Sequence, residues 1–129
     1  MFYTRRFCQF VMGVALLFSC IDEPQKLGID IEWELNGNQI EGQNKFSSTF
    51  YLTNSGTIAL DDQNWSLYYS MTPRGLVQDA HTGQVIFNHV SGDLFVIRPD
   101  SGFLLAPGEK REMSFEGRDF ILKHSDRPA

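Results

Sequence analysis

The run I-D-I-E-W-E-L at residues 29–35 limits the fold of this chain more than any other feature. Apolar and acidic residues alternate strictly through it, and successive side chains of a β-strand point to opposite faces. An amphipathic helix would instead place its apolar residues three and four positions apart. The run therefore predicts a half-buried strand, and we expect the turn residues N-G-N at 36–38 to close it.

Two further runs show the same alternation. The first is K-F-S-S-T-F-Y-L-T-N at 45–54, which ends at the turn residues N-S-G at 54–56. The second is N-W-S-L-Y-Y-S at 64–70, in which Trp65 is expected to belong to the core. The predicted inward residues are Phe46, Phe50, Leu52, Trp65, Leu67 and Tyr69, and the predicted outward residues are Thr49, Tyr51, Thr53, Ser66, Tyr68 and Ser70.

Shorter strands are predicted at 85–90, 94–97 and 111–115, separated by the turn sequences H-T-G, V-S-G-D and A-P-G-E. No segment after residue 20 shows a long helical period. Six or so short strands over about a hundred residues favour an all-β fold, an antiparallel β-sandwich of immunoglobulin-like type.

The first twenty residues predict a signal peptide. Arg5 and Arg6 precede an apolar run at 7–18 in which Gln9 is the one polar residue. This run is shorter than the roughly 20 apolar residues that span a bilayer. Its end, L-F-S-C at 17–20, resembles a bacterial lipobox, which implies a signal peptide over 1–19 and a lipid on Cys20. The alternative is that Cys20 is an ordinary thiol near an ordinary cleavage site.

The charge balance excludes some partners. Once the two signal arginines are removed, nine Lys and Arg remain against sixteen Asp and Glu, a net charge near −7. We therefore expect no nucleic-acid partner, and the lipid rather than electrostatic attraction would hold the chain to a membrane. Cys8 leaves with the signal, so the mature chain forms no internal disulfide. We expect a short polar tether over 20–27 and one β-sandwich domain over 28–129.

Histidines and carboxylates offer no convincing catalytic or metal site. His81, His89 and His124 fit no zinc-ligand spacing, and we expect no metal and no cofactor. Ser91 lies near His89 and Asp93, but no G-x-S-x-G elbow is present. The adjacent acidic pairs, at 22–23 on the tether and at 61–62 in a turn, lie in no predicted pocket. We assign no catalytic residue.

Binding is the remaining function. Tyr51 and Tyr68 are predicted on outward strand faces, where an aromatic ring provides a platform for a sugar ring. The alternative is that they are ordinary exposed aromatic residues, which most protein surfaces carry.

Five segments in order resemble the N-terminal domain of bacterial family 20 β-N-acetylhexosaminidases, the chitobiase type. They are L-T-N-S-G at 52–56, N-W-S-L-Y-Y-S at 64–70, H-V-S-G-D-L-F-V-I-R-P at 89–99, F-L-L-A-P-G-E at 103–109 and H-S-D-R-P-A at 124–129. The resemblance implies a non-catalytic sandwich similar to cellulose-binding modules, which in the family precedes a catalytic barrel with an Asp-Glu pair. No such motif occurs in this chain, so no catalytic role carries over. On this basis S-G-D at 91–93 is a hairpin turn, with His89 and Asp93 in local hydrogen bonds.

Two functions stay open. One is the N-terminal domain, or a fragment cut at its last strand, of a lipid-anchored β-N-acetylhexosaminidase, a glycoside hydrolase acting on terminal amino sugars of glycans. The other is a free-standing, lipid-anchored module that binds carbohydrate or protein with no enzyme attached. In both we expect the chain in a bacterial cell envelope, membrane-anchored through Cys20. The partners are amino-sugar glycans and, for a fragment, a catalytic barrel in cis.

Overall fold

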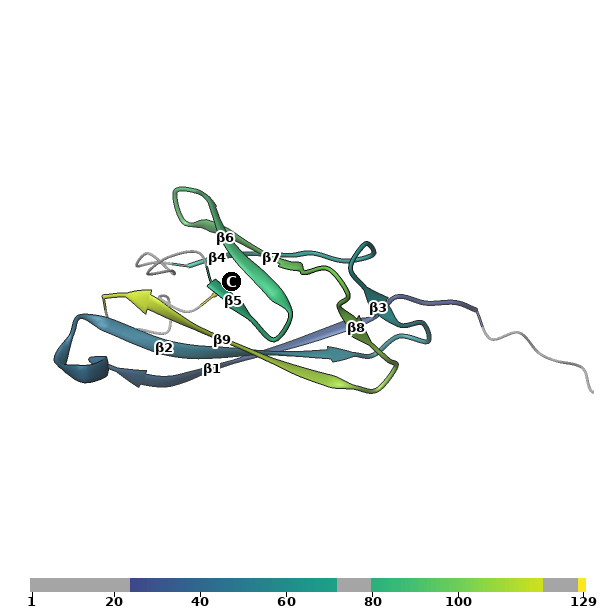
Figure 1. The fold of residues 1–129 in the computed structure, drawn as a ribbon, viewed down its shortest axis with the longest axis horizontal. Coiled ribbons are helices and arrows are strands. Elements are labelled where there is room, and N and C mark those ends of the chain that lie inside the picture. Colours follow the sequence, from purple (N-terminus) through teal and green to yellow (C-terminus); the bar gives the residue numbers. More distant parts are fainter. Residues whose placement is uncertain (1–23, 72–79, 120–127) are drawn as a thin grey trace, which may run out of the picture.

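The computed structural model describes residues 24–71, 80–119 and 128–129, and these form an antiparallel β-sandwich (Figure 1). The all-β class predicted from the alternating runs is confirmed. The strands are β1 (Ile29–Asn38), β2 (Lys45–Asn54), β3 (Leu60–Asp61), β4 (Leu67–Ser70), β5 (Ala80–Thr82), β6 (Val85–Ser91), β7 (Leu94–Pro99), β8 (Leu104–Leu105) and β9 (Lys110–Arg118), with one 3-10 turn, η1 (Ile40–Gly42). The described residues include no helix long and apolar enough to cross a membrane.

The strands make two facing layers and a small closing ribbon. One layer is the three-stranded sheet β1-β2-β9, and the other is the four-stranded sheet β4-β7-β6-β5. The ribbon β3-β8 lies at the end of the sandwich from which the N-terminal segment leaves (Figure 1). All the pairings are antiparallel, which short turns between consecutive strands allow.

The prediction that N-G-N at 36–38 closes the first strand is wrong. β1 continues through Asn38 and absorbs an irregularity in register between Leu35 and Gly37. Such a β-bulge adds one residue to a strand without ending its pairing. The chain reverses one step later, through η1, where Gln39 and Glu41 have positive φ values of 55° and 53°.

The inward faces agree with the alternation. Phe46, Phe50 and Leu52 are buried, whereas Ile29 at the start of the edge strand β1 is exposed rather than inward. Thr49 points outward as predicted but is 4% exposed, because β2 is the central strand of its sheet. Its hydroxyl donates to Asn36 Oδ1 at 2.9 Å and contacts the Ser114 hydroxyl at 2.9 Å.

An aromatic cluster fills the space between the sheets. Phe50 of one sheet lies 5.0 Å from Tyr69 of the other, ring centre to ring centre, and 5.6 Å from the stacked ring of Phe115. Phe87 packs against Phe115 at 5.2 Å. Burying rings of this size supplies most of the stabilisation available to a small domain. Trp65, predicted in the core, is 9% exposed and belongs to this cluster.

The start of the described chain lies against the sandwich. Lys26 N donates to Thr57 Oγ1 at 2.9 Å, and Thr57 N donates back to Lys26 O at 2.8 Å. Ser55 N donates to Gly28 O at 3.0 Å. The two segments cross so closely that a Cβ at Gly28 would lie 2.7 Å from Gly56 N. Residues 24–27 of the predicted tether, together with Gly28, are therefore hydrogen-bonded to the loop after β2.

At the other end of the chain, Ala129 pairs with Ser70 of β4. Its N–H donates to Ser70 O at 2.9 Å, and Ser70 N donates to Ala129 O at 3.0 Å. The last residue thus lies beside β4, on the edge of the four-stranded sheet.

Candidate carbohydrate-binding site

The segment with three polar side chains of catalytic type, His89, Asp93 and Arg98, belongs to the β6–β7 hairpin. Gly92 has the positive φ of 58° that its turn requires, and His89 Nε2 lies 2.9 Å from Gly92 O. The carbonyl of Asp93 accepts a hydrogen bond from Met71 N at 2.9 Å. His89 packs against Phe95 with ring centres 4.9 Å apart. The turn and a local hydrogen bond of His89 are confirmed, whereas the hydrogen bond of Asp93 joins its backbone to Met71, a residue distant in the sequence.

The acidic pair Asp61 and Asp62 also stabilises turns. Asp61 Oδ1 accepts a hydrogen bond from Gln63 N at 2.9 Å, and Asp62 Oδ2 accepts one from Gly102 N at 3.1 Å. The Gly102 hydrogen bond lowers the pKa of Asp62, so this carboxyl stays ionised at neutral pH. A glycosidase acid requires the opposite shift, toward a protonated carboxyl.

Metal chemistry has no support within the described part of the chain. No group of three or more His, Cys, Asp or Glu side chains there could hold an ion. The side chain of His81, the whole of His124, and Cys20 lie outside the described residues.

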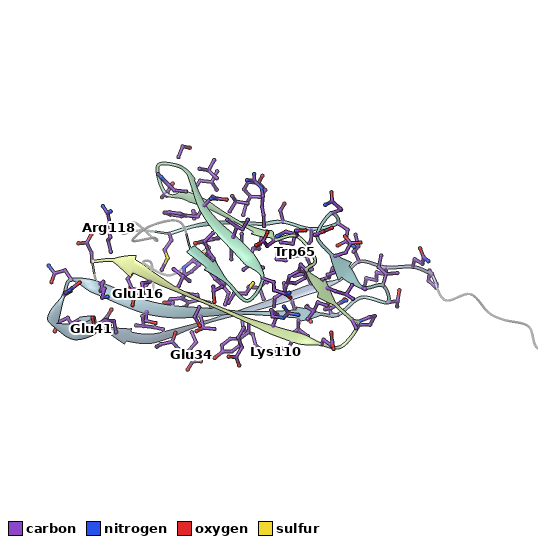
Figure 2. The ribbon with its side chains drawn as sticks, in the orientation of Figure 1. Glu34, Glu41, Trp65, Lys110, Glu116 and Arg118 are labelled. Atoms are coloured by element: carbon purple, nitrogen blue, oxygen red, sulfur yellow. The ribbon has the colours of Figure 1, made fainter. Side chains whose placement is uncertain are left out.

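Tyr51 lies on the outer face of the three-stranded sheet, and neighbouring charges cover it. Its hydroxyl donates to Glu34 Oε2 at 2.9 Å, and Lys110 Nζ lies 4.4 Å from the ring centre. Lys110 is held in place by an ion pair with Glu32 at 2.8 Å. The hydrogen bond to Glu34, followed by burial and nearby carboxylates, raises the pKa of Tyr51. Figure 2 shows Glu34 and Lys110 on this side of the sheet, away from the other layer.

Tyr68 lies on the outer face of the four-stranded sheet and is more open. It is 54% exposed, and a guanidinium nitrogen of Arg98 donates to its hydroxyl at 3.5 Å. Across the pair β4-β7 it lies opposite Val96, which is 1% exposed although it also belongs to this outer face. Asn88 of β6 pairs with Val96 on the other side. An exposed aromatic ring and two side chains that can donate hydrogen bonds therefore occupy neighbouring positions around the buried Val96.

The two tyrosines proposed from the sequence do not form one site. Phe50 and Leu52, which flank Tyr51, face the core, as does Tyr69 beside Tyr68. Since the two sheets pack through these core residues, Tyr51 and Tyr68 lie on opposite outer surfaces of the sandwich.

A shallow depression of about 470 Å³ lies at the β3–β8 end, lined by Ile29, Gln63, Asn64, Trp65 and Ser66. Figure 2 shows Trp65 close to this end. The side-chain amide of Asn64 makes hydrogen bonds to the backbone of its own loop. Its Oδ1 accepts from Asp61 N and its Nδ2 donates to Ala59 O, both at 3.0 Å. No local pattern in the sequence marks this depression, since only the fold brings the start of β1 beside the loop before β4.

The fold and these surfaces define a class: an antiparallel β-sandwich domain with an exposed aromatic residue on one sheet face. Residues 30–127 match the model of the family described as "Putative carbohydrate binding domain", and the chain belongs to this family. The family is found in the N-terminal regions of chitobiases and hexosaminidases, so the resemblance seen in the sequence is confirmed. No match to a curated protein is found.

Proposed function

We propose that this chain is the non-catalytic, carbohydrate-binding N-terminal domain of a lipid-anchored β-N-acetylhexosaminidase that acts on terminal amino sugars. The observation that carries the proposal is the family match over residues 30–127. That family accompanies hexosaminidases, and a domain beside a glycosidase benefits from holding the enzyme on its polymeric substrate, because linked binding raises the effective concentration.

The surface around Tyr68 is the best candidate for the glycan contact. The apolar face of a sugar ring packs on an exposed aromatic ring, and a few polar groups around it fix orientation. Arg98 and Asn88 supply donors beside Tyr68. Tyr51 fits this role less well, because Lys110 already lies over its ring.

Hydrolysis belongs, in this proposal, to a catalytic barrel in cis. The carboxylates considered for chemistry in the described residues are exposed or bonded in turns, and Asp62 has a lowered pKa. We expect purified residues 21–129 to release no chromophore from a nitrophenyl N-acetylglucosaminide. The DNA after codon 129 offers an independent check: a barrel with an Asp-Glu pair supports the proposal, and an unrelated gene favours the free-standing module.

The location in the cell envelope rests on L-F-S-C at 17–20. Fatty-acid labelling of cells that express the wild type or Cys20→Ser tests it. We expect label on the wild type alone, and equal labelling of the two would exclude this anchor.

The glycan contact is tested by isothermal titration calorimetry, in which residues 21–129 are titrated with a soluble N-acetylglucosamine oligosaccharide. We expect Tyr68→Ala to weaken binding about tenfold, which corresponds to about 1.4 kcal/mol. Tyr51→Ala is the matched control on the opposite surface and should bind like the wild type. A weakening by Tyr51→Ala alone would place the contact on the other sheet, and no binding by the wild type would contradict the proposal.

A further inference from the structure

The end of the sandwich formed by the β3–β8 ribbon carries an unusual share of exposed apolar side chains. Leu27 is 47% exposed, Ile29 36% and Leu104 60%. The only other large apolar residues exposed to this degree in the described chain are Tyr68 and Val90. Leu27 and Ile29 precede and begin β1, and Leu104 pairs with Asp61 in the ribbon, so all three belong to the same end of the molecule (Figure 1).

The N-terminal segment also leaves the sandwich at this end. Its described part, from Pro24 onward, is hydrogen-bonded to the sandwich. Thr57 holds it by three hydrogen bonds, to Pro24 O at 3.2 Å and to Lys26 N and O. The crossing at Gly28 and Gly56 leaves no room for a side chain at either position. The first described residue, Pro24, is therefore already hydrogen-bonded to the sandwich.

The chain length between Cys20 and Pro24 then limits the distance from the anchor. Four residue steps span at most about 14 Å when fully extended. A strand as long as β1, ten residues, extends over about 33 Å. A lipid on Cys20 would thus hold the β3–β8 end at the bilayer surface, whereas the turn of the β6–β7 hairpin projects from the sandwich away from that end (Figure 1).

We propose that the β3–β8 end of the sandwich, with Leu27, Ile29 and Leu104, is a membrane-contact surface that lies against the bilayer in which the anchor is inserted. This inference rests on the proposed lipidation of Cys20. The partner is the lipid surface itself, because exposed apolar side chains gain by entering the boundary between headgroups and acyl chains. The acidic chain has no electrostatic attraction to anionic lipid, so the contact is apolar and insensitive to salt.

One consequence concerns the glycan surface. Tyr68 belongs to a sheet face rather than to the β3–β8 end. A domain that rests on this end directs its sheet faces sideways from the membrane and leaves them accessible to a soluble or polymeric glycan.

The test uses the full-length lipoprotein with a single environment-sensitive fluorophore. Cys8 leaves with the signal and a lipidated Cys20 has no free thiol, so Leu104→Cys and Val90→Cys each give one labelling position. Val90, 47% exposed on the β6–β7 hairpin away from the ribbon, is the matched control. Each labelled protein is reconstituted in phosphatidylcholine vesicles that contain lipids with a nitroxide quencher near the headgroup.

We expect quenching at position 104 to exceed quenching at position 90 by at least threefold, with no change between low and high salt. Equal quenching at the two positions, in protein that carries the fatty-acid label, would overturn this inference and leave the anchor intact. Absence of the fatty-acid label from the wild type would overturn the anchor and the inference together. Neither result bears on glycan binding, which is measured on the soluble residues 21–129.

Discussion

Replacing Asn54 by alanine should destabilise the domain more than its small size suggests. Asn54 is completely buried at the end of β2, and its amide group satisfies three backbone partners. Nδ2 donates to Ile58 O and to Leu105 O, each at 2.9 Å, and Oδ1 accepts from Gly56 N at 3.0 Å. At about 1 kcal/mol of net stability for each bond, Asn54→Ala loses about 3 kcal/mol. That is a large part of the 5–15 kcal/mol that a domain typically has.

This loss is measured by urea denaturation of residues 21–129, with tryptophan fluorescence as the signal of unfolding. The midpoint should fall while the slope with denaturant stays the same, since the fold itself is unchanged. Asn88→Ala is the control, because it makes the same chemical change at a partly exposed site on β6 and should alter stability by less than about 0.5 kcal/mol. If Asn54→Ala were as stable as Asn88→Ala, the three hydrogen bonds of Asn54 would contribute no net stability.

Three further predictions follow from the core and the outer face of the β1-β2-β9 sheet. Trp65→Ala should cost about 3–5 kcal/mol in thermal or chemical unfolding, since Trp65 packs on Phe103 with ring centres 5.2 Å apart; an unchanged melting temperature would contradict its place in the core. Tyr69→Phe should stabilise the domain by about 1 kcal/mol in urea unfolding, because its buried hydroxyl has no hydrogen-bond partner among the described residues; a loss of stability would mean that the hydroxyl is bonded. Glu34→Gln should move the pKa of Tyr51 down toward its ordinary value, because Glu34 is the main cause of the raised pKa. A ¹³C NMR titration of the Tyr51 Cζ carbon measures this pKa. In the wild type this raised pKa contributes stability that is present below about pH 10 and is lost as the pH rises through the folded-state value.

The alternating runs were sufficient to predict the long strands β1 and β2, which pair with each other in one sheet. The pattern in 29–35 and 45–54 depends only on which face of each strand is buried, and that is a local property. The position of Trp65 in the core followed from the same logic. The hairpin at His89 and Asp93 was also predictable, because S-G-D has turn chemistry within a few residues.

Other features depend on contacts between distant residues and were not predictable from local patterns. The two-residue strands β3 and β8 exist because Leu60 meets Leu105 across the fold. The bulge near Gly37 keeps N-G-N inside a strand, although the same letters favour a turn. Burial of Thr49 follows from the central place of β2 in its sheet, which alternation alone does not specify.

The candidate site shows the same division. The outward orientation of Tyr51 and Tyr68 could be predicted, but the difference in how accessible their rings are could not. That difference depends on Lys110, which the pairing of β2 with β9 brings over Tyr51. The hydrogen bonds between the tether and Thr57 likewise join residues 31 positions apart, and no local pattern marks them.

We propose that this sandwich binds glycan on the sheet face around Tyr68, and chemical-shift mapping is the measurement that tests this binding residue by residue. A ¹⁵N-labelled sample of residues 21–129 is titrated with an N-acetylglucosamine oligosaccharide, and the amide shifts are followed by residue. Binding at this face should concentrate the shifts on β4, β6 and β7 around Tyr68, Asn88 and Arg98, and the shifts should saturate with ligand. Shifts confined to β1 and β9 around Tyr51, or no saturable shifts at all, would contradict it.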